Sequence, residues 1–304
     1  MASRFRVRSA SQAGNPDVPN EDWVMSTDDV VVVLDGATVR TDTGCEHGVP
    51  WYVQHLGPAL INGAAGRRSL TQVLADAIRV VAAAHPGCDL THPGTPSASV
   101  GMVRAVDDVV QYLTLGDVSL VLDLEDELRV ITDDRISQTA LEQRKEADRY
   151  PIGSPDKQRA LLAMKPVELA ARNRDDGYWI AAADPAAADH AITGDVPFTR
   201  VRRLGLASDG AARAVAFGLV NWREALDLAP EVVIEQVRKA ERHDPKGIKW
   251  PRNKASDDAT LASITAWRQT DRDSGWHDDL RPFGVSHRLL GAETCRTGRR
   301  GPSK

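Results

Sequence analysis

The chain has 304 residues, of which 42% are hydrophobic and 27% charged, and its formal net charge at pH 7 is -5. This length allows one large domain or two small ones with a sizeable core, and the acidic balance without a basic face excludes a nucleic-acid-binding class. No apolar run approaches the roughly 18 residues that a membrane span needs, and the N-terminus lacks a stretch of signal-peptide type, so we expect a cytoplasmic protein with neither nucleic acid nor membrane as a partner.

The first part of the chain predicts strands followed by a helical pair. Residues 3–12 and 21–34 have strand patterns, and residues 30–34 form a continuous, mostly β-branched run that is typical of a strand buried on both faces. Pro50 suits the first turn of a helix that continues over 51–61. Ser69 is a good N-cap residue, so a second helix is predicted to start there.

The middle of the chain predicts a set of neighbouring strands. A loop rich in proline and glycine over 86–96 precedes them. Their connections are short and polar, which favours an antiparallel meander over helical crossovers. The predicted strands cover 97–106, 108–115, 118–124 and 127–132.

The remaining segments alternate between helical and strand patterns. Helices are predicted over 137–149, 157–174, 211–218, 221–228 and 230–242, and strands over 177–183, 199–208 and 259–267. This mixture indicates an α+β domain over 1–268, with helices stacked outside sheets. The tail over 269–304 is rich in Arg, Gly, Asp and Ser, and we expect it to be partly disordered.

Short acidic motifs recur along the chain, and three of them follow an apolar run. Asp35, Asp117 and Asp209 each stand at the end of a predicted strand, which suggests one oxygen-rich site suited to Mg²⁺ or Mn²⁺. Ordinary turn chemistry is the alternative, since Asp-Gly and Gly-Asp are favoured turn dipeptides. That alternative stays open for Asp117, whereas Asp35, Asp209 and Asp257 end buried strands and need a partner.

The order of these motifs resembles that of the metal-dependent protein phosphatases of the 2C type (the PPM family), in a bacterial-like form. The resemblance covers 1–268. It implies a central β-sandwich of two mainly antiparallel sheets flanked by helical pairs, in four αββα layers. The matching motifs are Glu21-Asp22, Asp35-Gly36, Gly116-Asp117, Ser208-Asp209-Gly210 and Asp257-Asp258-Ala259-Thr260.

The resemblance also implies an activity and roles for these residues. The chain would be a monomer that hydrolyses phosphoserine and phosphothreonine on a phosphorylated protein, through a water activated by two Mn²⁺ or Mg²⁺ ions. The implied roles are Asp35 bridging both ions, the Gly36 carbonyl binding one, Asp209 and Asp257 binding the other, Asp117 holding a third ion, and Glu21 and Asp22 orienting coordinated waters.

The phosphate-binding half of the site departs from the family pattern. Many members carry an arginine four residues before the motif glutamate, and this chain has Asp17 there. Arg6, Arg8 and Arg40 are candidates to replace it, although Arg6 and Arg8 alternate along a strand as a solvated face would. The basic loop over 246–254 could also attract a phosphorylated substrate, and a solvated loop is the slightly favoured alternative.

The loop after Asp35-Gly36 is unusually long and carries a histidine and a cysteine. His47 precedes a predicted helix and could act as a general acid, although a surface histidine packing on Trp51 is the favoured alternative. Cys45 and His47 form a C-x-H pair without an evident second pair, which argues against a zinc site. With Cys88 and Cys295 the cysteines are an odd, sparse set, typical of reduced thiols.

Two other functions remain open. The missing arginine motivates a weakly active or inactive regulatory module that binds a phosphorylated partner. A small-molecule phosphatase is the other, in which the loop over 37–48 shapes the pocket.

Overall fold

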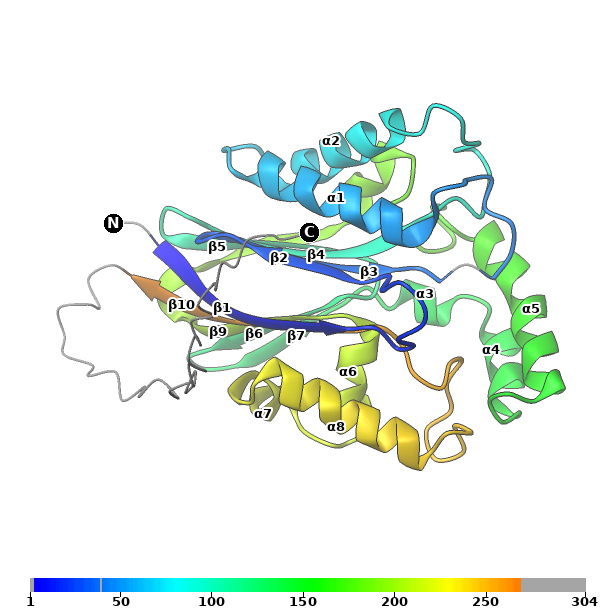
Figure 1. The fold of residues 1–304 in the computed structure, drawn as a ribbon. Helices are drawn as coiled ribbons and strands as arrows, with labels where there is room; N and C mark the ends of the chain where they lie inside the picture. The colour runs from blue at the N-terminus through cyan, green and yellow to red at the C-terminus, as the bar shows by residue number, and fades with distance from the viewer. Residues whose placement is uncertain (1–2, 39, 269–304) are drawn as a thin grey trace, which may run out of the picture. The chain divides into compact units, whose positions relative to one another are not determined.

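Two five-stranded antiparallel sheets face each other in the computed structural model, which describes residues 3–38 and 40–268 (Figure 1). The first sheet has the strand order β1 (Ser3–Gln12), β10 (Ala259–Arg268), β9 (Val201–Ala207), β6 (Ser119–Leu124) and β7 (Leu128–Ile131). The second has the order β2 (Trp23–Ser26), β3 (Val30–Gly36), β4 (Ala98–Val106), β5 (Val109–Leu115) and β8 (Ile192–Pro197).

Helices cover the outer face of each sheet. Two helices lie over the second sheet, α1 (Gly48–Ala64) and α2 (Leu70–Ala83), and three lie over the first, α6 (Asp209–Ala216), α7 (Trp222–Asp227) and α8 (Pro230–His243) (Figure 1). Three more are α3 (Arg135–Gln138), α4 (Leu141–Asp148) and α5 (Pro155–Ala170), and two 3-10 turns cover Pro185–His190 and Phe198–Arg200. The predicted α+β class, a sandwich with helices outside it, is confirmed.

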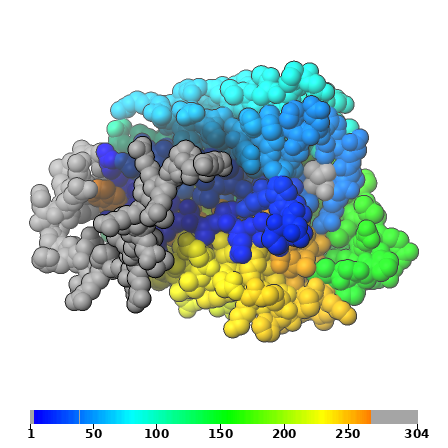
Figure 2. Space-filling view, viewed as in Figure 1, coloured from blue at the N-terminus to red at the C-terminus, as the bar shows by residue number. Residues whose placement is uncertain are grey.

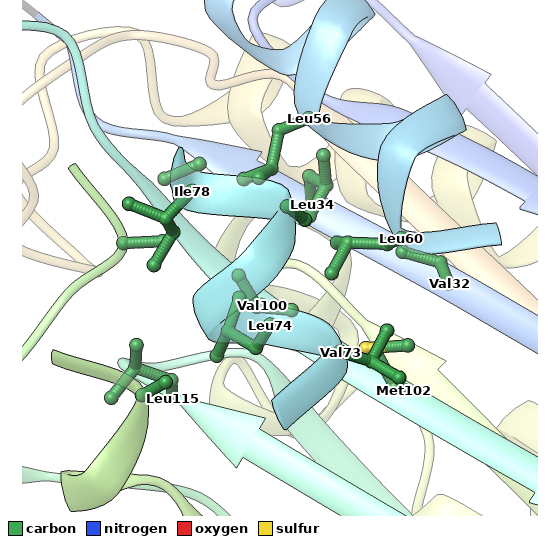
Figure 3. Packing of buried hydrophobic residues seen from close by; sticks show 14 of the residues in the cluster. Val32, Leu34, Leu56, Leu60, Val73, Leu74, Ile78, Val100, Met102 and Leu115 are labelled. Carbon is green, nitrogen blue, oxygen red and sulfur yellow. The ribbon is translucent and has the colours of Figure 1, made fainter. Parts of the chain in front are cut away.

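Strand β3 is buried on both faces, as its β-branched run predicts. Val31 and Val33 face the first sheet, whereas Val32 and Leu34 face the helical layer, and all four are fully buried. Figure 3 shows Val32 and Leu34 packed against α1 side chains such as Leu56. Full burial of such a side chain stabilises the fold by roughly 1.5–3 kcal/mol. The buried part of β3 therefore fixes the position of its last two residues, Asp35 and Gly36.

The helical pair has well-defined ends. Ser69 caps α2, because its hydroxyl accepts from the Gln72 N–H at 3.2 Å and the Gln72 side chain accepts from the Ser69 N–H at 3.2 Å. The side chain of Arg104, only 2% exposed, binds the backbone of the connection from α1 to α2. It donates to three backbone carbonyls, those of Ala64 at 3.2 Å, Gly66 at 2.9 Å and Arg68 at 2.7 Å.

The predicted four-stranded meander is wrong at its centre. β4 pairs with β5 and β6 pairs with β7, but β5 and β6 belong to different sheets. Gly116 has a φ of +77°, a left-handed conformation that a glycine adopts without strain. The chain crosses there from one sheet to the other, and this places Asp117 between the two.

Three smaller predictions also need correction. Residues 21–34 form two strands, because a turn at Thr27 separates β2 from β3. Residues 177–183 form no strand, only isolated bridges at Tyr178 and Ala181. The edge strand β8 was missed, since its exposed Ile-Thr-Gly-Asp sequence lacks the apolar pattern of a buried strand.

The predicted tail lies outside the described residues. Among the helices of the described part of the chain, none combines the length and the apolar character that crossing a membrane requires.

Candidate active site

Four of the predicted carboxylates line one cavity of about 310 Å³. Asp35 is the penultimate residue of β3, Asp209 opens α6 directly after β9, and Asp257 lies two residues before β10. Asp117 lies where the chain crosses from β5 to β6. The second sheet therefore supplies Asp35, the first sheet supplies Asp209 and Asp257, and the crossing supplies Asp117.

Asp35 and Asp209 are joined directly. The backbone N–H of Asp209 donates to a carboxylate oxygen of Asp35 at an N···O distance of 2.9 Å. The glycines next to them let two other backbone segments pass close by. A Cβ at Gly36 would lie 2.3 Å from the Glu21 carbonyl oxygen, and one at Gly210 would lie 2.0 Å from the Asp258 carbonyl oxygen.

The electrostatics of the cavity favour a bound cation. Asp209 opens onto the cavity, yet the protein around it excludes enough water to raise its pKa to about 8, and the charge of Asp257 adds to this. Desolvation also raises the pKa of Asp35 well above its usual value, with Asp209 contributing, and burial raises that of Asp117. Carboxylates that repel one another in this way are stabilised by a cation among them.

Two basic side chains already hold Asp257. Arg213 donates to one of its carboxylate oxygens at 2.8 Å, and Lys254 contacts the other. Lys254 also donates to the hydroxyl of Thr38, which in turn donates to the Glu21 carboxylate at 2.6 Å. Asp257 is therefore the most strongly charge-compensated member of the set.

A second layer of acidic residues supports the first. Asp258 accepts from the backbone N–H of Gly14 at 2.8 Å and from that of Glu21 at 2.7 Å. These bonds fix the segment between β1 and β2, which lies at the surface beside the segment before β10 (blue and orange in Figure 2). Burial raises the pKa of Asp22 to about 7, and one of its buried carboxylate oxygens has no hydrogen-bond partner within the described residues.

This donor set fits Mg²⁺ or Mn²⁺. Both ions prefer oxygen ligands, and the cavity offers the carboxylates of Asp35, Asp209 and Asp117 with the backbone of Gly36. The unpartnered oxygen of Asp22 suits a residue that orients a water bound to such an ion. An ion at Asp257 would share that carboxylate with Lys254 and Arg213.

The predicted arginines are placed differently from one another. Arg40 lines the cavity. Arg8 instead donates to backbone carbonyls at the end of α7, among them that of Leu226 at 3.4 Å, and Arg6 is exposed on β1. Asp17 is exposed on the loop between β1 and β2 and is not among the residues that line the cavity.

Three further cations line the cavity with Arg40: Arg144 of α4, Lys165 of α5 and Lys254. Sequence reasoning missed the first two, because a charged helical segment does not reveal which side chain faces inward. The solvated alternative for the loop over 246–254 is wrong at its end, since Asn253 and Lys254 both line the cavity.

His47 is not among the residues that line this cavity. Its ring packs on Trp51 with centroids 4.4 Å apart, as the favoured alternative predicts. Its Nδ1 also lies 3.4 Å from Cys88 Sγ and 3.7 Å from Cys45 Sγ.

Neither a protein-family model nor a curated protein sequence matches the chain. Solved structures do. One is the catalytic domain of the serine/threonine protein phosphatase PstP in complex with two manganese ions, at 16% identity and a TM-score of 0.52, over 88% of this chain and 100% of that one.

Two other solved structures are similar to the same extent. PppA, a regulatory component of T6SS in Pseudomonas aeruginosa, matches at 16% identity and a TM-score of 0.51, over 88% of this chain and 99% of its own. The serine/threonine phosphatase Stp1 from Staphylococcus aureus matches at 13% identity and a TM-score of 0.51, over 86% and 94%. At such low identity these likenesses show the fold, and the four-layer phosphatase 2C fold predicted from the motifs is confirmed.

Proposed function

We propose that this chain is a metal-dependent phosphatase that hydrolyses phosphoserine and phosphothreonine monoesters on proteins. The observation that carries the proposal is the meeting of Asp35, Asp117, Asp209 and Asp257 in one cavity, on the fold of the PPM phosphatases. The PstP structure contains two manganese ions, and the oxygen donors of this cavity suit the same kind of ion.

The residues divide into ion-binding and supporting groups. Asp35, the Gly36 carbonyl and Asp209 would hold two ions together with Asp257, while Asp117 would hold a third. When bound, such ions lower the pKa of a shared water and neutralise charge on the phosphoryl oxygens. The N–H of Asp209 keeps the Asp35 carboxylate oriented, and Glu21 and Asp22 would orient the coordinated waters.

The cations of the cavity supply the phosphate-binding half. Arg40, Arg144, Lys165 and Lys254 come from separate segments and line the same space as the carboxylates. Arg144 and Lys165 already pair with Glu168, which lines the cavity too. The family pattern has an arginine where this chain has Asp17, and an exposed aspartate cannot bind phosphate. We infer that Arg40 and Lys254 take over the role of that arginine. We assign His47 no role in this chemistry, because it is not among the residues that line the cavity.

One observation favours a second candidate, a weakly active regulatory module. Both carboxylate oxygens of Asp257 are engaged, one by Arg213 and one by Lys254. If Lys254 stays on Asp257 when ions are present, it takes the place of one of them, and turnover would be slow. In either case we propose a cytoplasmic monomer whose partner is a phosphorylated protein.

The test is hydrolysis of p-nitrophenyl phosphate by the full chain, with Mn²⁺ and with EDTA. We expect turnover with Mn²⁺, none with EDTA, and a loss of at least about 100-fold in kcat/KM for Asp35→Asn and Asp209→Asn. Asp195→Asn changes an exposed residue of β8, is the matched control and should keep full activity. Turnover that survives both EDTA and the two cavity variants would overturn the metal assignment.

A second measurement separates the substrates. Rates on phosphoserine and phosphothreonine peptides are compared with those on small phosphorylated metabolites under the same Mn²⁺ conditions. Preference for the peptides supports the proposal, whereas peptide binding without turnover supports the regulatory module, and preference for metabolites supports a small-molecule phosphatase.

A further inference from the structure

A second cluster of metal-binding side chains lies outside the acidic cavity, at the N-terminus of α1. It consists of Cys45, His47 and Cys88, whose ligand atoms all lie within 4.8 Å of one another. Cys45 and His47 come from the loop before α1, and Cys88 comes from the loop after α2. The two loops are tied together, because the backbone N–H of Asp89 donates to the Gly44 carbonyl at 2.8 Å.

The third ligand is far along the chain from the C-x-H motif, since Cys88 lies 41 residues after His47. The expectation against a zinc site depended on the lack of a second pair at zinc spacing. Spacing alone did not reveal Cys88, because two helices stand between it and the motif and only the fold brings them together.

The distances within the cluster agree with a shared tetrahedral ion. With Zn–S of about 2.3 Å and Zn–N of about 2.05 Å, a tetrahedral angle separates sulfur and nitrogen by about 3.6 Å. The observed distances from His47 Nδ1 are 3.4 Å to Cys88 Sγ and 3.7 Å to Cys45 Sγ. Both sulfurs thus already lie where two ligands of one ion would lie.

His85 supports His47 and is not one of the three clustered ligands. The ligand atoms that lie within 4.8 Å of one another belong to Cys45, His47 and Cys88 alone among the described residues. The His85 ring packs edge-on against that of His47, with centroids 5.1 Å apart, and its Nδ1 lies 2.8 Å from the Val81 carbonyl. Three protein ligands leave the fourth tetrahedral position of a zinc ion to water.

The backbone favours a thiolate at Cys45, because the N–H of His47 donates to its Sγ at 3.4 Å. At Cys88 a backbone hydrogen bond from Glu46 lowers the pKa, but desolvation and the neighbouring Cys45 and Glu46 raise it above its usual value, so an ion would have to displace the proton there. Both sulfurs also lie next to the N-terminus of α1, whose positive end lowers the cost of a thiolate. A thiolate is the form that binds zinc.

We propose that Cys45, His47 and Cys88 form a zinc site that is separate from the acidic cavity. Thiolates and imidazoles select zinc, whereas the oxygen donors of the cavity select Mn²⁺ or Mg²⁺, so the chain would sort two kinds of metal by ligand chemistry. The ion would pin the loop that carries Thr38 and Arg40 to the loop that leads into β4. Zinc would thereby hold one wall of the cavity in place.

The test uses the full reduced chain with the Mn²⁺ concentration held constant. We expect about one tightly bound zinc per chain, and Co²⁺ in its place should show the sulfur charge-transfer bands of a tetrahedral thiolate site. That spectrum needs no variant, so it remains informative even if a variant misfolds. A carboxylate site cannot produce these bands.

Variants then assign the ligands. Cys45→Ser and Cys88→Ser should lose the charge-transfer bands, and His47→Ala should weaken zinc binding by more than about 100-fold, since even changes in supporting residues cost 10–100-fold. Cys295→Ser and His55→Ala are the matched controls and should bind zinc as the parent does. A reduced parent without stoichiometric zinc, bands that survive in Cys45→Ser and Cys88→Ser, or a Cys45–Cys88 disulfide that zinc does not prevent would each overturn the proposal.

Discussion

The backbone N–H of Asp209 donates to the carboxylate of Asp35, 174 residues away in the sequence, at 2.9 Å. Asp35 is the penultimate residue of a strand of one sheet and Asp209 follows a strand of the other, so this bond links the two halves of the sandwich inside the cavity. Packing brings the carboxylates together, although their mutual repulsion opposes it. The predictions below follow from that conflict and from the groups that relieve it.

Without metal ions, raising the pH should destabilise the fold. The pKa of Asp209 is about 8 in the fold against a usual 3.8, and that of Asp35 is also raised. The folded chain therefore holds these protons more tightly than the unfolded chain, and the stability they contribute is complete below about pH 4 and lost as the pH rises through about 8. Urea unfolding in EDTA between about pH 5 and 8 measures this fall.

Asp209→Asn should make that fall shallower, since an amide does not titrate, and Asp195→Asn should leave it unchanged. If Asp209→Asn follows the parent at every pH, the carboxylates are not the cause. Added Mn²⁺ should restore stability most at the high end of the range, where the carboxylates are charged.

Gly210→Ala should destabilise the fold and disturb the cavity together. The new Cβ would lie 2.0 Å from the Asp258 carbonyl oxygen, and the backbone before β10 would have to move. We expect a loss of about 1–3 kcal/mol in the free energy of unfolding. Gly66→Ala is the matched control, because its Cβ would meet nothing within 4 Å. Equal stability of the two variants in urea would contradict the packing described here.

Lys254→Gln should weaken substrate binding more than it weakens folding. Lys254 contacts Asp257 and Thr38 at the cavity wall, where its charge can reach a phosphoryl group. We expect kcat/KM for p-nitrophenyl phosphate to fall about 10- to 100-fold, mainly through KM. Lys249→Gln, on the same loop with its ammonium 4.0 Å above the Trp250 ring, should change little. A rise in kcat for Lys254→Gln would instead indicate that the lysine competes with a metal ion.

Arg104→Met should destabilise the fold by about 2–4 kcal/mol, because a buried charged donor serves several acceptors. Its guanidinium donates to three carbonyls between α1 and α2 and to Gln111. Arg67→Met is the matched control, since the Arg67 side chain is 86% exposed and its ion pair with Asp107 spans 3.5 Å. Thermal unfolding that does not separate the two variants would show that the α1–α2 connection is held by something else.

Much of the fold is encoded locally and could be predicted. The buried run of β3, the Ser69 cap and the apolar faces of the helices each depend on neighbouring residues. The sheet to which a strand belongs does not depend on neighbouring residues in this way. β5 and β6 follow each other closely, yet they lie in different sheets, because Gly116 turns the chain across the sandwich. The strand pattern of a sequence does not show in which of the two sheets a strand lies.

The candidate site divides in the same way. The carboxylates could be predicted because they follow strands in a recognisable order. Arg40 and the loop that ends at Lys254 are among the sequence candidates, whereas Arg144 and Lys165 could not be predicted, since they lie on charged helices whose orientation is set by tertiary packing. The pairing of Cys88 with His47 likewise depends on how two loops meet.

The central claim is that the cavity of Asp35 and Asp209 binds divalent ions, and direct counting of bound Mn²⁺ tests it best. Equilibrium dialysis followed by metal analysis should find about two Mn²⁺ per parent chain, and the same number in Cys45→Ser/Cys88→Ser and Asp195→Asn. Asp35→Asn and Asp209→Asn, shown to be folded by circular dichroism, should each bind fewer than one at the same free Mn²⁺ concentration. Mn²⁺ binding that is equal in the parent and in both cavity variants would contradict the account.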